Sequence, residues 1–276
     1  MRRLGGAAAA TAGSAAVLLL LLLAALVPHL LAPFDPLAID PSAAFRPPSA
    51  DHWLGTDESG RDTYSRVVHG ARESLLIGAA ATGIGLGLAL LLGVPAGLGA
   101  GGGPTGRRLD FGIGRILEVL FSLPGLLLAL VFIAFAGPGV GTAVVAVGLG
   151  TAPGYARIVR AQVAALRTSG MIEAAVVLGR SPARILLRHL LPNALGPVLV
   201  LATLGLGQAV VWASALSFLG LGAPPPAPEW GAMLSAGRIY LGIAWWLTVF
   251  PGLAIVLVAA ASTVLGRSLQ RRTVGA

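Results

Sequence analysis

Six long runs of apolar residues divide the sequence, and they constrain its fold more than any other feature. Each run is about as long as, or longer than, the ~20 residues that an α-helix needs to cross the hydrocarbon core of a bilayer. The composition agrees, because 56% of the 276 residues are hydrophobic and 11% are charged, against about 25% charged residues in a soluble domain. We therefore expect an all-α integral membrane protein with six transmembrane helices. These would cover residues 14–32, 74–100, 111–136, 140–159, 194–219 and 242–266.

The first apolar run follows Met1-Arg2-Arg3, a flank that is typical of a signal peptide as well as of a membrane span. We expect an uncleaved span, because the run is longer than the apolar part of a signal peptide and no clear small-residue cleavage site follows it. The chain would then have four parts. These are a cytoplasmic N-terminus with the first span (1–32), an external loop (33–73), a five-span core (74–266) and a cytoplasmic tail (267–276).

The distribution of arginine predicts the orientation. All 19 basic residues are Arg, and with six spans most of them fall on the side that holds both termini. The exceptions are Arg46, Arg61, Arg66, Arg72 and Arg238. Because positively charged residues favour the cytoplasmic side of a membrane, we expect both termini in the cytoplasm and the protein in the cell membrane.

The external loop carries alternating charges just before the second span, from Asp57 to Glu73. This pattern predicts a helix lying at the outer interface, with the charges in an anchoring role. The tryptophans of the C-terminal third, Trp230, Trp245 and Trp246, suit an aromatic belt at the membrane surface.

The sequence contains no Lys and no Cys. A P-loop needs a Lys to reach the nucleotide phosphates, and disulfides, thiol nucleophiles and thiolate metal sites need Cys. The four histidines show no zinc-site spacing. We therefore expect a chain that catalyses no bond chemistry, binds no metal or cofactor and has no nucleic-acid partner.

Few polar side chains lie deep in the expected spans. Gln208, Trp212 and Ser214 in the fifth span are our candidates for residues that face a transport path, because polar groups inside membranes often serve function. Arg115 and Glu118 in the third span are three residues apart, so we expect them to pair with each other.

Glycines recur four residues apart in the second span, as in Gly83 with Gly87 and Gly93 with Gly97. Such pairs let helix backbones approach closely where lipid provides no hydrophobic drive. Because the chain has 39 glycines, chance matches are expected, and we interpret these pairs as packing and not as a dimer code.

A polar segment between the fourth and fifth spans, residues 173–193, reads EAAVVLGRSPARILLRHLLPN. Gly179 breaks the helix before it, whereas Ser181 and Pro182 form a helix start and Pro192 would end that second helix. We expect two short cytoplasmic helices, over 169–178 and 182–191. The first exposes apolar surface, which indicates either a protein partner or contact with membrane lipids.

The same segment resembles the EAA motif of permease subunits of binding-protein-dependent ABC importers, in its Glu-Ala-Ala, its glycine and its closing Leu-Pro-Asn. The resemblance implies a type I ABC importer permease fold, with a coupling loop at 160–193 that docks on a separate ATPase. ATP and Mg²⁺ would be used by that partner. The implied docking positions are Glu173, Ala174, Ala175 and Gly179, and the implied supporting positions are Ser181, Pro182, Pro192 and Asn193.

Two further stretches, HWLGTDESGRDTYSRVVHGARESLLIG (52–78) and FLGLGAPPPAPEWGAML (218–234), are similar to the six-span subunit of dipeptide, oligopeptide and nickel permeases. The resemblance covers roughly 14–266. It implies a heterodimer with a sister permease, two ATP-binding subunits and an external solute-binding protein. Di- or oligopeptides are the expected substrates, with nickel or glutathione as alternatives.

Two other classes are weighed against this one. A stand-alone secondary carrier would need charged residues within its spans or inverted repeats, and a membrane enzyme would need a nucleophile or a metal constellation. We see neither pattern in the sequence.

Overall fold

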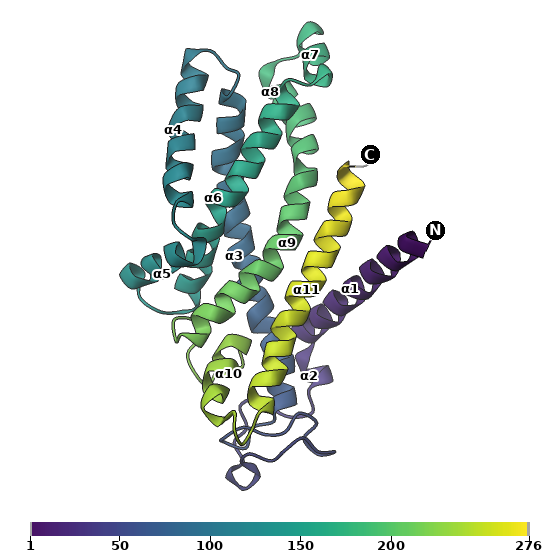
Figure 1. The fold of residues 1–276 in the computed structure, drawn as a ribbon, viewed down its shortest axis with the longest axis vertical. Helices are drawn as coiled ribbons and strands as arrows, with labels where there is room; N and C mark the ends of the chain where they lie inside the picture. Colours follow the sequence, from purple (N-terminus) through teal and green to yellow (C-terminus); the bar gives the residue numbers. More distant parts are fainter. Residues whose placement is uncertain (1, 275–276) are drawn as a thin grey trace.

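Long helices dominate the computed structural model, which describes residues 2–274 (Figure 1). Within that range the only strand-like pairing is an isolated bridge between Thr56 and Asp62. Five helices contain segments long and apolar enough to cross a membrane, so the expected all-α membrane bundle is confirmed. They are α1 (Arg2–Leu26), α3 (Thr63–Gly99), α6 (Val140–Arg167), α9 (Leu191–Phe218) and α11 (Trp246–Val274).

The third expected span, 111–136, is wrong as a single straight helix. It is divided into α4 (Pro104–Phe121) and α5 (Gly125–Ala136), which are bent by 87° relative to each other. Pro124 explains the break, because it has no N–H to donate and disfavours helical backbone at Leu123. Counted as one broken span, the two helices raise the number of candidate crossings to six.

The helices α3 and α6 lie side by side and approach closely at glycines. A Cβ atom at Gly93 would lie 2.7 Å from the carbonyl oxygen of Ala156, and one at Gly97 would lie 2.7 Å from that of Arg160. Any larger side chain would push the two backbones apart. The pair Gly93 and Gly97 therefore packs within the bundle, as expected, whereas the expectation is wrong for Gly83 and Gly87, where a Cβ would have nothing within 4 Å.

Buried charges hold the start of α3. The charged stretch that we expected to be helical is a loop up to Asp62 and then forms the first turns of α3, which begins at Thr63. Asp62 caps α3 by accepting hydrogen bonds from the N–H and Oγ of Ser65, both at 2.7 Å. Asp57 pairs with Arg61 at 2.7 Å and with Arg66 at 3.5 Å. Since all four charged side chains are buried, they anchor the loop from inside the protein and not at the lipid surface.

Two tryptophans that we expected in an interface belt lie in the core instead. Trp230, the first residue of α10 (Trp230–Gly237), is fully buried and donates its indole N–H to the Val67 carbonyl at 2.9 Å. Trp246 donates to the Thr56 carbonyl at 3.0 Å. Trp245 is 49% exposed. The buried pair fixes the last third of the chain onto α3 and the loop before it.

The remaining short elements of this end of the molecule are α2 (Pro28–Leu31), η1 (Pro41–Ala43) and η3 (Arg238–Tyr240).

The glycine contacts predict a position-dependent response to a single methyl group. Gly97→Ala places its Cβ against the Arg160 carbonyl, so it should destabilise the protein by about 1–3 kcal/mol. Gly87→Ala is the matched control, because nothing lies within 4 Å of a Cβ there and Ala is the better helix former by up to ~1 kcal/mol. Thermal unfolding of the detergent-solubilised variants, followed by size-exclusion chromatography, measures both. Equal melting temperatures for the two variants would contradict the packing described.

Candidate functional site

A short helix, α7 (Gly170–Val177), projects from the end of the bundle opposite the loop that precedes α3 (Figure 1). It coincides with the first helix expected in the polar segment, and only a short link joins it to α6. Ile172 and Ala175 are buried. The other side is open, because Val177 is 86% exposed and Leu178 is 73% exposed. The apolar surface expected on this helix is therefore present.

A glycine motif closes the C-terminus of α7. The Arg180 N–H donates to the Ala175 carbonyl at 3.1 Å, and the Gly179 N–H donates to the Val176 carbonyl at 2.9 Å, which is the Schellman pattern. Gly179 has φ +68°, a conformation that costs most residues with a Cβ about 1–2 kcal/mol. A Cβ there would have no atom within 4 Å. The backbone therefore requires the glycine, while the space around it is open.

The second predicted helix begins as expected. The Ser181 side chain accepts the Arg184 N–H at 3.4 Å, and Pro182 is the first residue of α8 (Pro182–Ile185). Asn193, farther along the chain, has its Nδ2 3.8 Å from the Met171 sulfur of α7. The loop thus folds back on itself, and three of the four supporting positions lie at the start of a helix or beside α7.

Pro192, the fourth supporting position, does not end the second helix, and that expectation is wrong. A π-helical segment, η2 (Leu186–Leu190), leads from α8 directly into α9, of which Pro192 is the second residue. The Leu191 N–H donates to the Leu186 carbonyl, one residue farther back than in an α-helix. This wider turn accommodates the proline, which cannot donate a hydrogen bond of its own.

The expected docking positions divide between the two sides of α7. Glu173 and Ala174 are exposed, Ala175 is buried at 5% exposed, and Gly179 is exposed beyond the end of the helix. Glu173 forms no ion pair with any side chain that the structure describes, residues 9–271. Three of the four positions are thus accessible to another chain, whereas Ala175 serves the packing of α7.

A cleft lies between α9, α6 and the break that separates α4 from α5. Gln208 and Trp212, one turn apart on α9, line a cavity of about 280 Å³ together with Tyr155 of α6. Ser214 does not reach this cavity, because it is buried at 4% exposed and its backbone packs against Gly231 of α10. The fold therefore brings together two of the three pathway candidates and leaves Ser214 on another face.

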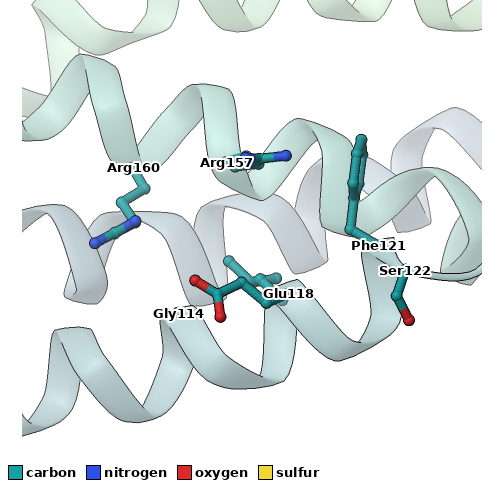
Figure 2. A pocket seen from close by; sticks show the side chains of 7 residues that line it. Gly114, Glu118, Phe121, Ser122, Arg157 and Arg160 are labelled. Atoms are coloured by element: carbon teal, nitrogen blue, oxygen red, sulfur yellow. The ribbon is translucent and has the colours of Figure 1, made fainter.

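A second cavity of about 280 Å³ adjoins the first, and Phe121 lines both. Figure 2 shows Glu118 of α4 and Arg160 of α6 extending into the space between these helices, and Arg157 beside the ring of Phe121. The Arg157 guanidinium carbon lies 4.9 Å from the centre of that ring. We did not single out Arg157 or Phe121 in the sequence, because nothing there indicates that α4 lies against α6.

Two ion pairs on α4 differ in their surroundings. Asp110 binds Arg160 of α6 through two hydrogen bonds, at 2.6 and 2.9 Å, and joins segments 50 residues apart. Arg115 and Glu118 form the expected pair within α4, at 2.9 Å, with side chains that are 68% and 65% exposed. The first pair therefore fixes the wall of the cleft, whereas the second contributes little to stability.

A bundle of candidate membrane-crossing helices, with a helix projecting from one end and a cleft along one side, is the architecture of an integral-membrane protein, and the family match identifies it as a permease. The chain belongs to the family of binding-protein-dependent transport system inner membrane components, whose pattern matches residues 93–275. Within that family it is an ABC importer permease of the peptide branch.

Named relatives resemble the chain over most of its length. It is 42% identical over 232 residues to the dipeptide transport system permease protein of Alkalihalophilus pseudofirmus, which covers 84% of this chain and 74% of that protein. It is 43% identical over 223 residues to the glutathione transport system permease protein of Shigella flexneri, covering 81% and 72%. It is 38% identical over 240 residues to the probable D,D-dipeptide transport system permease protein of Escherichia coli, covering 87% and 78%.

A solved structure supports the fold. The chain superimposes with a TM-score of 0.58 on a chain of the MetNI methionine ABC transporter in an inward-facing conformation, covering 74% of this chain and 96% of that one at 24% identity. The expected permease fold is confirmed, and the likeness concerns the fold alone.

The two ion pairs of α4 predict different effects of the same change from acid to amide. Asp110→Asn removes the charge that binds Arg160, so the melting temperature of the purified protein should fall by several degrees, as expected for a loss of about 1–2 kcal/mol. Glu118→Gln removes a charge from an exposed pair and should change stability by less than about 0.5 kcal/mol. An equal or greater loss in Glu118→Gln would show that the Asp110 pair does not hold the cleft wall.

Proposed function

We propose that this chain and a sister permease form the path through which an ATP-driven importer moves di- or oligopeptides into the cell. An external solute-binding protein delivers the substrate, and two ATP-binding subunits hydrolyse ATP with Mg²⁺ on the cytoplasmic side. The names of the relatives support this, since two of the three reported above are named for dipeptide transport.

The open end of α7 is the observation that carries the coupling role. Val176, Val177 and Leu178 are 60%, 86% and 73% exposed, and burying such side chains on a partner gains about 25 cal/mol per Å². In the sequence, contact of this helix with membrane lipids was the alternative to a protein partner. The only charged residue of α7 is Glu173, and an anionic membrane surface repels an acid. A groove on an ATPase subunit is therefore the better partner for α7.

The orientation follows from the same assignment. If α7 docks on an ATPase, its end of the bundle faces the cytoplasm. Both chain ends lie toward the same half of the molecule (Figure 1), which agrees with the excess of arginine expected on the cytoplasmic side. The loop that precedes α3, and α10 beside it, then face the solute-binding protein.

Glutathione import is the second candidate, because the glutathione permease protein of Shigella flexneri is as similar to this chain as the dipeptide permease protein is. Glutathione is itself a small peptide with free carboxylates, so both candidates require a path for the same chemical class. The accumulation of labelled dialanine and labelled glutathione by cells that express all subunits distinguishes them.

The docking role of the loop predicts a charge-specific effect at Gly179. Asn and Asp both tolerate the left-handed conformation found there, so neither Gly179→Asn nor Gly179→Asp should unfold the protein. Gly179→Asp adds a charge to an apolar surface and should abolish ATPase binding and reduce uptake at least tenfold, whereas Gly179→Asn should retain most of both. Affinity purification of the tagged chain from membranes, with mass spectrometry of the chains that accompany it, measures the binding.

Glu173→Lys tests the same surface with a reversed charge, and we expect it to lose the ATPase subunits while the sister permease still co-purifies. Wild-type uptake by Glu173→Lys or Gly179→Asp, at normal membrane levels, would contradict docking at α7. A chain that purifies alone and still transports would favour the stand-alone carrier.

The pathway role predicts an effect of Gln208 on transport and not on assembly. Gln208→Leu removes a polar group from the wall of the cleft, so dipeptide uptake should fall several-fold with the ATPases still bound. Ser214→Ala is the matched control, because the hydroxyl is buried without a hydrogen-bond partner and away from the cleft. Unchanged uptake in Gln208→Leu would remove this residue from the path.

A further inference from the structure

We propose that Arg157 is the carboxylate-binding residue of the transport path, and that its guanidinium binds the C-terminal carboxylate of a peptide that crosses the membrane. This inference rests on the proposed function, because it names the group that recognises the substrate within the same path. It adds a substrate contact on α6 to the pathway candidates on α9.

The charge of Arg157 is not matched by any described group, unlike the charges of its neighbours. Arg160 binds Asp110 through two hydrogen bonds, and Arg115 binds Glu118. Among residues 9–271, whose side chains the structure describes, the Arg157 guanidinium forms no hydrogen bond or ion pair, and it lies 4.9 Å from the centre of the Phe121 ring. A charged side chain in a membrane segment is costly and almost always has a partner. A ring face attracts a cation but carries no net charge, and the carboxylate in the same cavity, Glu118, pairs with Arg115 and not with Arg157.

The geometry leaves Arg157 ready to bind a flat anion. A guanidinium has five N–H donors around its edge, arranged to bind both oxygens of one carboxylate. Figure 2 shows the Arg157 side chain extending along α6 toward the ring of Phe121, and its guanidinium carbon lies 4.9 Å from the centre of that ring. The aromatic contact restricts the side chain without using its hydrogen bonds. It therefore reduces the entropy lost when a ligand is bound.

Arg157 also lies where two cavities meet. It lines the cavity of about 280 Å³ next to α4 and a second, more open one of about 700 Å³ along α6. Ligand pockets for small molecules occupy about 300–1,000 Å³. Tyr155 lines both the larger cavity and the one that contains Gln208. A peptide that passes Gln208 therefore next meets Arg157.

The opposite wall offers the other charge. Glu118 of α4 lines the same small cavity as Arg157 of α6 (Figure 2), and its exposed carboxylate binds Arg115 through Oε2, which leaves Oε1 for the ammonium of a peptide. A peptide carries an ammonium at one end and a carboxylate at the other, so it meets a complementary charge on each wall. This arrangement favours a short zwitterion over a neutral solute of the same size.

The test compares dialanine with dialanine amide, which differ only in the carboxylate. Saturation-transfer-difference NMR measures their binding to the complete transporter without its solute-binding protein, so that only the permease path is probed. We expect wild-type protein to bind dialanine at least tenfold more tightly than the amide, a ratio that one charge-assisted hydrogen bond supports. Arg157→Gln should bring this ratio close to one, and Arg157→Lys should restore part of it. Arg108→Gln, whose side chain is exposed on α4 and lines neither cavity, should keep the wild-type ratio.

Three results would overturn the inference. They are a wild-type ratio near one, an unchanged ratio in Arg157→Gln, and loss of the sister permease from Arg157→Gln, which would make the residue an interface contact. Uptake of dialanine by cells with the complete importer distinguishes failure of the proposed carboxylate site from failure of the proposed dipeptide import. If the wild-type importer takes up dialanine but Arg157→Gln keeps the wild-type ratio of dialanine to dialanine amide binding, only the carboxylate site is rejected. If the wild-type importer takes up no dialanine, the proposed dipeptide import is rejected as well.

Discussion

Direct backbone contact between α3 and α6 is the constraint on which the other elements depend. Lipid gives helices no hydrophobic reason to associate, so close packing holds them together. At Gly93 and Gly97 the two backbones approach until no Cβ would fit. The helix α9 uses the same device, because Gly78 of α3 packs against Val210 and Gly205 of α9 packs against Tyr155. Both α6 and α9 contact α3 and line the cleft together with the break between α4 and α5, and α7 follows α6 in the chain.

Hydropathy predicted the membrane bundle, but it could not predict how each proline would act. Pro124 interrupts the helix between α4 and α5, whereas Pro192 lies in the first turn of α9, directly after a π-helical turn. Pro95, Pro153 and Pro251 lie inside long helices. In a membrane bundle, neighbouring helices and local changes of helix type satisfy the backbone groups that a proline leaves free. The effect of a proline therefore depends on its neighbours in space, which the sequence does not display.

The candidate site was predictable to different degrees. The positions of α7 and Gly179 followed from a local motif, which is written in consecutive residues. The pathway candidates were chosen by polarity alone, and helical geometry divides them, since at ~100° per residue Trp212 shares a face with Gln208 while Ser214 points elsewhere. Arg157 and Arg160 are only three residues apart. Their roles differ because Asp110 of α4 reaches one of them and no described carboxylate reaches the other.

The closed C-terminus of α7 has a thermal consequence. Because the Schellman bonds satisfy carbonyls at the end of this helix, the exposed patch around Val177 offers a partner mainly apolar surface and few hydrogen bonds. Apolar contact is driven by entropy near 25 °C and weakens on cooling. An ATPase subunit that binds the permease through such a patch would bind it less tightly at low temperature. Less solute would then be transported for each ATP hydrolysed.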